Sequence, residues 1–194
     1  MPRTSRTLAS AMLLLCVTVT GCDSSAPTLP DPPVPSASAT FTVPPLQLPE
    51  VPAGAACPVT AVRPWSGPGQ TGQVLGEGPL YPVADYFRGD TELELRPDDR
   101  QPDGSYVKKV RWIGVGYSGP VLVRAARIDA PGSAGVTFSY TGEERDGGHY
   151  AELTRETNDL PATTTVAGPG CYAYQVDGTS FSRTIVFRAV SSGG

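Results

Sequence analysis

The sequence predicts an all-β fold, an antiparallel β-sandwich, and three observations lead to it. Glycine and proline are abundant, 22 and 21 of 194 residues, and leave few uninterrupted stretches long enough for a helix. Between them lie short runs rich in β-branched and aromatic residues, which favour strands. About seven to nine such runs, separated by turns, are typical of a sandwich with immunoglobulin-like topology; a jelly roll or a small barrel is the alternative.

The first residues have the layout of a signal peptide, predicted over residues 1–21. Arg3 and Arg6 form a basic region with no acid near it, and the run from Leu8 to Val19 is mostly apolar. That run is shorter than the ~20 residues that a membrane-spanning helix needs, so a cleaved signal is favoured over a retained span. The two arginines are not adjacent, so a twin-arginine signal is not supported.

The residues Val19-Thr20-Gly21-Cys22 close this region. They resemble the lipobox of bacterial lipoproteins, with Val and Thr in place of the commoner Leu and Ala or Ser. The resemblance implies cleavage before Cys22, a diacylglycerol on its thiol, and an acyl chain such as palmitate on its amino group. Two or three chains hold a protein firmly on a bilayer. We therefore expect a lipid anchor on the extracytoplasmic side of the cell membrane; the alternative is an ordinary secretory signal with a chance cysteine.

Residues 22–55 form a proline-rich linker. Nine prolines lie between Asp23 and Ala55, among many Ser, Thr and Ala residues. Proline fixes φ and lacks an amide hydrogen, so neither a helix nor a central strand is expected. The linker is predicted to be disordered, extended and polyproline-like, with a reach on the order of 100 Å. A proline-rich ligand for another domain is the alternative.

The remaining residues, 56–194, have the length of one domain. Of the four cysteines, Cys16 leaves with the signal and Cys22 takes lipid. Cys57 and Cys171 remain, in an exported and oxidising setting, and are predicted to form a disulfide. Two buried free thiols are the alternative. No C-x-x-C pair supports a metal site.

The clearest strand is 106–117, which is rich in β-branched and aromatic residues. By parity Val110 and Trp112 share one face of it, and Ile113 lies on the other. The turn Ser118-Gly119-Pro120 follows, and 121–128 is expected to be a returning strand.

A second hairpin is predicted near the end of the chain. Asp177-Gly178 favours a type I′ turn, because both positions tolerate positive φ. The other expected strands are 59–62, 73–75, 91–95, 136–140, 150–153, 163–166, 171–176 and 179–190. The expected core comprises Val110, Trp112, Ile113, Val121, Val123, Phe138, Tyr140, Tyr174, Ile185 and Phe187.

Two segments, GPVLVRAARIDAPG (119–132) and GPGCYAYQVDGTSFSRTIVF (168–187), resemble a recurring pattern in uncharacterised exported bacterial proteins. The resemblance covers about half of the domain and supports the β fold. It implies no activity.

Charge and motifs exclude several function classes. The net charge is −4 and acids and bases are interspersed, so no nucleic-acid partner is predicted. His149 is the only histidine, which makes a Ser-His or Cys-His nucleophile pair hard to assemble. There is no G-x-S-x-G, H-E-x-x-H or P-loop motif, and no cofactor is predicted.

Two acidic stretches suggest a metal, and local turns explain both. The stretch 143–149 holds three acids and His149, but a solvated hairpin loop accounts for it. The stretch Asp98 to Asp103 begins like a calcium loop and then fails, because Gln101 and Val110 stand where ligands are needed. No metal site and no catalytic residue are therefore predicted.

Aromatic rings are the better clue to binding, because flat rings give contact area at low entropy cost. The candidates are Trp65 and three residues of the loop LYPVADYF, namely Tyr81, Tyr86 and Phe87. The favoured function is lipid-anchored display of a non-catalytic binding or structural surface to an envelope protein or glycan. The alternatives are an envelope hydrolase that acts on glycans through loop carboxylates, and an assembly factor for an envelope complex.

Overall fold

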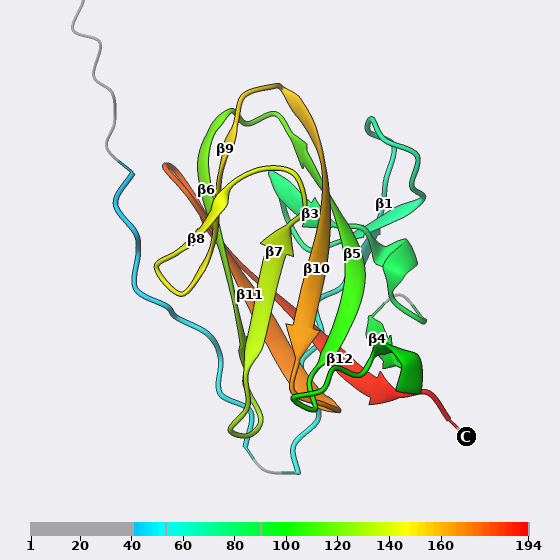
Figure 1. The fold of residues 1–194 in the computed structure, drawn as a ribbon. Coiled ribbons are helices and arrows are strands. Elements are labelled where there is room, and N and C mark those ends of the chain that lie inside the picture. Colours follow the sequence, from blue (N-terminus) through cyan, green and yellow to red (C-terminus); the bar gives the residue numbers. More distant parts are fainter. Residues whose placement is uncertain (1–40, 53, 90, 194) are drawn as a thin grey trace, which may run out of the picture. The chain divides into compact units, whose positions relative to one another are not determined.

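The computed structural model describes residues 41–52, 54–89 and 91–193. The predicted signal peptide, Cys22 and the first part of the predicted linker lie outside these ranges. The described chain forms two packed β-sheets and a small ribbon, so the predicted β-sandwich is confirmed (Figure 1). Among the described residues, no helix is both long enough and apolar enough to span a membrane.

The strands divide between the two sheets as follows. One sheet has the order β3-β5-β10-β7, with bounds Leu80–Pro82, Tyr106–Val115, Thr157–Val166 and Ala134–Phe138. The other has the order β4-β12-β11-β6-β9-β8, with bounds Glu92–Leu95, Ser182–Ser191, Gly170–Gly178, Gly119–Arg127, Gly148–Leu153 and Glu143–Arg145. The ribbon is β1 (Val62–Pro64) and β2 (Gln73–Leu75), and two short 3₁₀ helices are η1 (Ala84–Tyr86) and η2 (Pro97–Asp99).

The strand order matches an immunoglobulin constant domain with two additions. The order β3-β5-β10-β7 corresponds to strands A, B, E and D, and β6-β11-β12 corresponds to C, F and G. One addition is β4, which pairs parallel with β12. The other is the β8–β9 hairpin, which lies between β7 and β10 in the chain and pairs with β6. A jelly roll or a closed barrel does not fit this order.

The core lies between the two sheets and is centred on Trp112 of β5. Its ring centroid is 5.0 Å from that of Tyr174 and 6.3 Å from that of Phe138, both in edge-on geometry. Every residue of the predicted core is buried except Tyr140, which is 88% exposed. That prediction is wrong because β7 ends at Phe138, and the chain has left the sheet before Tyr140.

The strand predicted over 163–166 is longer in the structure, where β10 begins at Thr157 and includes Pro161. β10 lies between β5 and β7, and proline is unusual in a central strand. The carbonyl of Pro161 accepts the amide of Ser139 at 2.8 Å, so the nitrogen of Pro161 also faces the β7 side. At that point β7 has already ended. The missing amide hydrogen therefore breaks no ladder bond.

The predicted type I′ turn at Asp177-Gly178 is wrong. β11 continues through Gly178, and Asp177 pairs with Ser182 of β12. The connection comes later, where the Gly178 amide donates to the Phe181 carbonyl at 2.9 Å. The side chain of Asp177 is buried in a hydrogen-bond network, which holds its backbone extended against the local preference of Asp-Gly for a turn.

Candidate functional site

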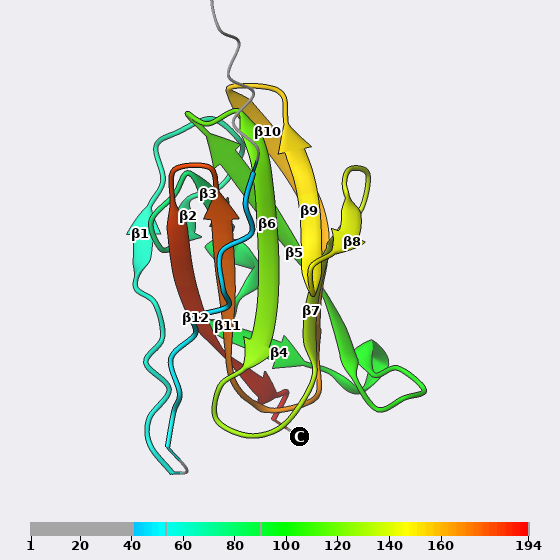
Figure 2. The ribbon, with the colours of Figure 1, turned by 90° about the vertical axis from the view of Figure 1, so that its left-hand side faces the viewer.

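Residues 41–52, which we call the strap, run along the outer face of β6 and β11 (Figure 2). The amide of Val51 donates to the carbonyl of Ile128 at 2.8 Å. Val51 and Leu48 pack with Ile128, Ala173 and Val186 in an apolar cluster separate from the main core. Residues before 56, where the domain is predicted to begin, therefore pack on the sandwich.

A buried ion pair lies beneath the strap. Arg124 of β6 donates to Asp177 of β11 at 2.7 Å, and their side chains are 8% and 0% exposed. Gln175 donates to both oxygens of Asp177, at 3.0 and 3.1 Å, and Ser182 donates to one of them at 2.7 Å. Both oxygens of this carboxylate thus have hydrogen-bond donors, as burial of a charge requires.

The strap completes this network with main-chain atoms. Arg124 Nη2 donates to the carbonyl oxygen of Pro44 at 2.8 Å, and Gln175 Nε2 donates to that of Pro45 at 3.0 Å. The amide of Gln47 donates to Gln175 Oε1 at 2.6 Å. Arg124 Nε is also buried and has no hydrogen-bond partner among the described residues. The sheet therefore presents buried donors and an acceptor that match the backbone of an extended chain.

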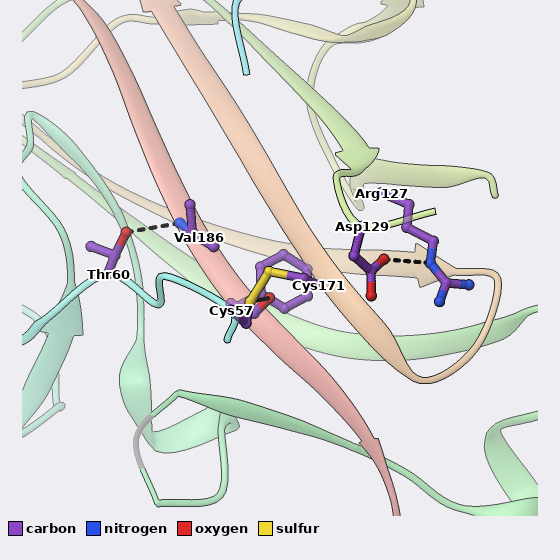
Figure 3. Close-up of a disulfide and its surroundings, with 7 residues drawn as sticks. Cys57, Thr60, Arg127, Asp129, Cys171 and Val186 are labelled. Atoms are coloured by element: carbon purple, nitrogen blue, oxygen red, sulfur yellow. Dashed lines mark hydrogen bonds and ion pairs between the residues drawn. A yellow bond between two sulfur atoms is a disulfide. The ribbon is translucent and has the colours of Figure 1, made fainter. Parts of the chain in front are cut away.

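Cys57 and Cys171 form the predicted disulfide, with their Cα atoms 5.6 Å apart (Figure 3). It joins the segment after the strap to the start of β11, 114 residues later in the chain. Nearby, the Val186 amide donates to Thr60 Oγ1 at 2.8 Å. The covalent link therefore lies after the strap in the chain, and the strap itself depends on its own contacts.

Arg127 and Asp129 form an ion pair beside the disulfide, at 2.7 Å (Figure 3). Burial raises the pKa of Asp129, but hydrogen bonds from Arg127 and from the Cys171 backbone outweigh it and leave the pKa below its ordinary value. Arg127 also donates to the carbonyl of Pro169 at 2.9 Å. These contacts tie the end of β6 to the turn that opens β11.

Two of the predicted binding aromatics meet on the surface. The ring centroids of Trp65 and Tyr81 are 5.0 Å apart, with the rings tilted by 60°. Each ring lies directly on a glycine: a Cβ atom would stand 2.5 Å from the Trp65 ring at Gly67, and 2.1 Å from the Tyr81 ring at Gly78. Both rings are half-buried and help to line a groove of ≈ 340 Å³, which we call the aromatic groove; its lining is Arg63, Pro64, Trp65, Ser66, Gly67, Val74 and Tyr81.

The other two predicted binding aromatics, Tyr86 and Phe87, do not line the aromatic groove. Tyr86 is 37% exposed, on η1, and lies outside the lining of the aromatic groove. Phe87 is 5% exposed and packs edge-on against Phe187, with ring centroids 5.7 Å apart. Phe87, a predicted binding residue, is therefore a buried core side chain, because the residue after η1 turns into the core.

His149 and the acids beside it do not converge on a metal site. His149 is buried, its Nε2 lies 2.9 Å from the carbonyl oxygen of Thr141, and its ring packs edge-on against Phe138. Glu143 and Asp146 are exposed on the β8–β9 hairpin and face Arg145. Within the described ranges, no three His, Cys, Asp or Glu residues gather closely enough to hold a metal ion.

Among the described residues, no carboxyl group with a resolved shift has a raised pKa. A glycosidase acid needs a raised pKa so that it can give a proton at neutral pH. Hydrogen bonds and ion pairs instead lower the pKa of each carboxyl group with a resolved shift: Glu92, Asp99, Asp103, Asp129 and Asp159. These carboxyl groups serve ion pairs and turns.

Comparison with known proteins assigns no family. No protein-family model, curated protein or solved structure matches this chain. The functional role of each residue is therefore inferred from its contacts and burial.

No sequence pattern gave Arg124, Gln175 or Asp177 a role in a binding site. A signal was present, since Gln175 and Asp177 are polar residues two apart in an otherwise apolar strand and must lie on one face of it. The Asp177-Gly178 turn signal hid that pattern. Gln47 of the strap lies 128 residues before its partner Gln175 in the chain. No local pattern in the sequence connects the two segments.

Proposed function

We propose that this chain is a lipid-anchored envelope protein whose sandwich displays a non-catalytic binding surface outside the cell membrane. The observation that supports it is the order of parts along the chain. A signal-like segment ends in Val-Thr-Gly-Cys22, a proline-rich segment follows, and a disulfide-tied sandwich comes last. Acyl chains on Cys22 would hold the first part on the bilayer, and the proline-rich segment would set the reach of the sandwich.

We assign the binding surface to the aromatic groove and its ligand to the envelope glycans. Trp65 and Tyr81 offer flat apolar faces, and Arg63 and Ser66 add polar groups at the same groove. Sugar rings bind well to such a combination, because their C–H faces stack on aromatic rings while their hydroxyls need polar partners. The lowered pKa values of the shifted carboxyl groups favour binding without turnover over hydrolysis.

The anchor is tested by labelling and by mass spectrometry of the mature protein. Cells given an alkyne-tagged fatty acid should label the wild type, and the mature amino terminus should be a lipid-modified Cys22. The variant Cys22→Ala should lose the label and leave the membrane fraction, whereas Cys16→Ala, a cysteine within the apolar run, should keep both. An unmodified Cys22 in the mature wild type would refute the anchor.

The glycan surface is tested by titration of purified envelope polysaccharide and its fragments. Trp65→Ala and Tyr81→Ala should each weaken binding by about 10-fold or more (~1.4 kcal/mol), because each removes one of the two flat rings on which a sugar can stack. Tyr140→Ala removes the most exposed large hydrophobic ring, which lies outside the groove, and should leave binding unchanged. If all three variants bind the glycan equally well, the aromatic groove is not the binding surface. The lipid anchor would not be affected by that result.

A further inference from the structure

We propose that the outer face of β6 and β11 is a binding groove for an extended, proline-containing peptide, and that the strap is its resident and exchangeable occupant. The donors of the groove are held by the sheet itself. Asp177 of β11 accepts hydrogen bonds from both Arg124 and Gln175, and neither bond involves a strap residue. Side chains held in this way present their remaining donors in a fixed direction.

The hydrogen bonds across the groove join side chains of the sheet to main-chain atoms of the peptide. Arg124 and Gln175 donate to two consecutive carbonyl groups, those of Pro44 and Pro45, and Gln175 accepts the amide of Gln47. Neither proline has an amide hydrogen, so this part of the strap brings no donor that needs a partner in the groove. A proline-containing segment is also extended before it binds, which reduces the entropy lost on docking.

Two apolar side chains of the strap pack onto the sheet. Leu48 and Val51 pack in the cluster with Ile128, whereas Leu46, Pro49 and Glu50 are exposed. Leu48 and Val51 are three residues apart, which is one turn of a polyproline helix. The ligand class is therefore an extended segment with two adjacent prolines, followed by apolar residues three and six positions after the second.

The strap is placed so that it can leave without unfolding the sandwich. Its only backbone-to-backbone hydrogen bond to the sheet, among the described residues, is from Val51 to Ile128. The disulfide holds the chain at Cys57, after the strap has ended, and the exposed residues Pro52, Gly54 and Ala55 lie between the two. Segments with few backbone bonds to the body of a domain open at a lower free energy than its central strands.

The occupant that replaces the strap is the corresponding segment, residues 41–52, of a second copy of this chain, because that segment is the one shown to fit these donors. In the intact chain the strap competes with that segment at an effective concentration that a short connection raises to the millimolar range. Binding of the partner segment should therefore be weak until the strap is released. The inference does not depend on the lipid anchor or on the aromatic groove.

The test separates the strap from the sheet after the protein has folded. A protease site replaces residues 52–55 in the full chain, the folded protein is cut, and the strap fragment is removed by dialysis. A fluorescent synthetic peptide with the sequence of residues 41–52 is then titrated in. We expect saturable one-to-one binding to the cut protein, at least about 10-fold tighter than to the uncut protein.

Two modified peptides provide the matched controls. Methylation of the Gln47 amide removes its hydrogen bond to Gln175 and should weaken binding by 10-fold or more (~1.4 kcal/mol). Methylation of the Leu46 amide, on an exposed residue one position earlier, should change it by less than about 2-fold. Equal binding of the two peptides, or no saturable binding to folded cut protein, would overturn the proposal. Unfolding of the cut protein when the strap leaves would also overturn it, because the strap would then be part of the fold rather than a ligand.

Discussion

The hydroxyl groups of Thr164 and Tyr174 lie 2.6 Å apart, in a hydrogen bond that joins the two sheets across the core. Both side chains are fully buried. Burial raises the pKa of Tyr174 above its ordinary value, although the hydrogen bond with Thr164 acts in the opposite direction. The phenol is therefore protonated at neutral pH and needs a partner, which β10 supplies.

Thr164→Val should lower the free energy of unfolding by about 1–3 kcal/mol, because it leaves the Tyr174 hydroxyl buried without a partner. Adding Tyr174→Phe removes that stranded hydroxyl, so the double variant should lose less than the sum of the two single variants. Urea denaturation of all four proteins measures the coupling. Strictly additive losses would mean that the hydrogen bond contributes nothing to stability.

Asp177→Asn should lower the free energy of unfolding by about 3–5 kcal/mol, because it leaves the charge of Arg124 buried and unpaired. The matched control is Asp146→Asn, which also removes one ion-pairing carboxylate, but on an exposed turn. That control should change stability by less than about 0.5 kcal/mol. Similar losses in the two variants would argue against a special role for the buried pair.

Replacing both Cys57 and Cys171 by Ser should lower stability by about 4–5 kcal/mol in the chain-entropy description, because the disulfide closes a loop of more than 100 residues. Thermal unfolding with and without a reducing agent measures the loss. Reduction of the wild type should reproduce the stability of the double variant, and the double variant should be insensitive to the reductant. A wild type that is equally stable in both conditions would contradict this prediction.

The pair Arg127–Asp129 should make stability depend on pH below about 4. The pKa of Asp129 is lower in the folded protein than its value of about 3.9 in an unfolded chain. The stabilisation is therefore complete above about pH 4 and is lost as the pH falls through the lower folded value. Asp129→Asn should melt earlier than the wild type at pH 7, and the difference should shrink as the pH falls below 4. A difference that stays constant down to pH 2 would contradict this assignment.

Phe87→Ala should destabilise the protein by about 3–5 kcal/mol, because it opens a cavity beside Phe187. Tyr86→Ala, at the preceding position, truncates a ring that is 37% exposed and should cost much less. Chemical denaturation of the two variants separates core from surface at adjacent positions. Equal losses would place both rings in the same environment.

The sequence by itself could predict most of the sandwich. Alternation in 106–117 identified Val110 and Trp112 as core residues, and the two remaining cysteines identified the disulfide. These predictions succeed because strand parity and the placement of turn residues are local properties of the chain. The lipid anchor on Cys22 also comes from local residues, and it stays a prediction.

Which surfaces form and which polar groups meet depends on how distant segments pack together. The local sequence of Asp177 predicts a turn, but in the fold Arg124, Gln175 and Ser182 surround its side chain. The local sequence of Phe87 predicts a surface ring, but in the fold Phe187 packs against it. Proline-rich residues 41–52 look like free linker until β6 and β11 offer donors for their carbonyl groups. The physical reason is that burial and hydrogen-bond partners are set by residues far apart in the chain. A local pattern gives the direction of a side chain from its strand, but not what stands opposite it.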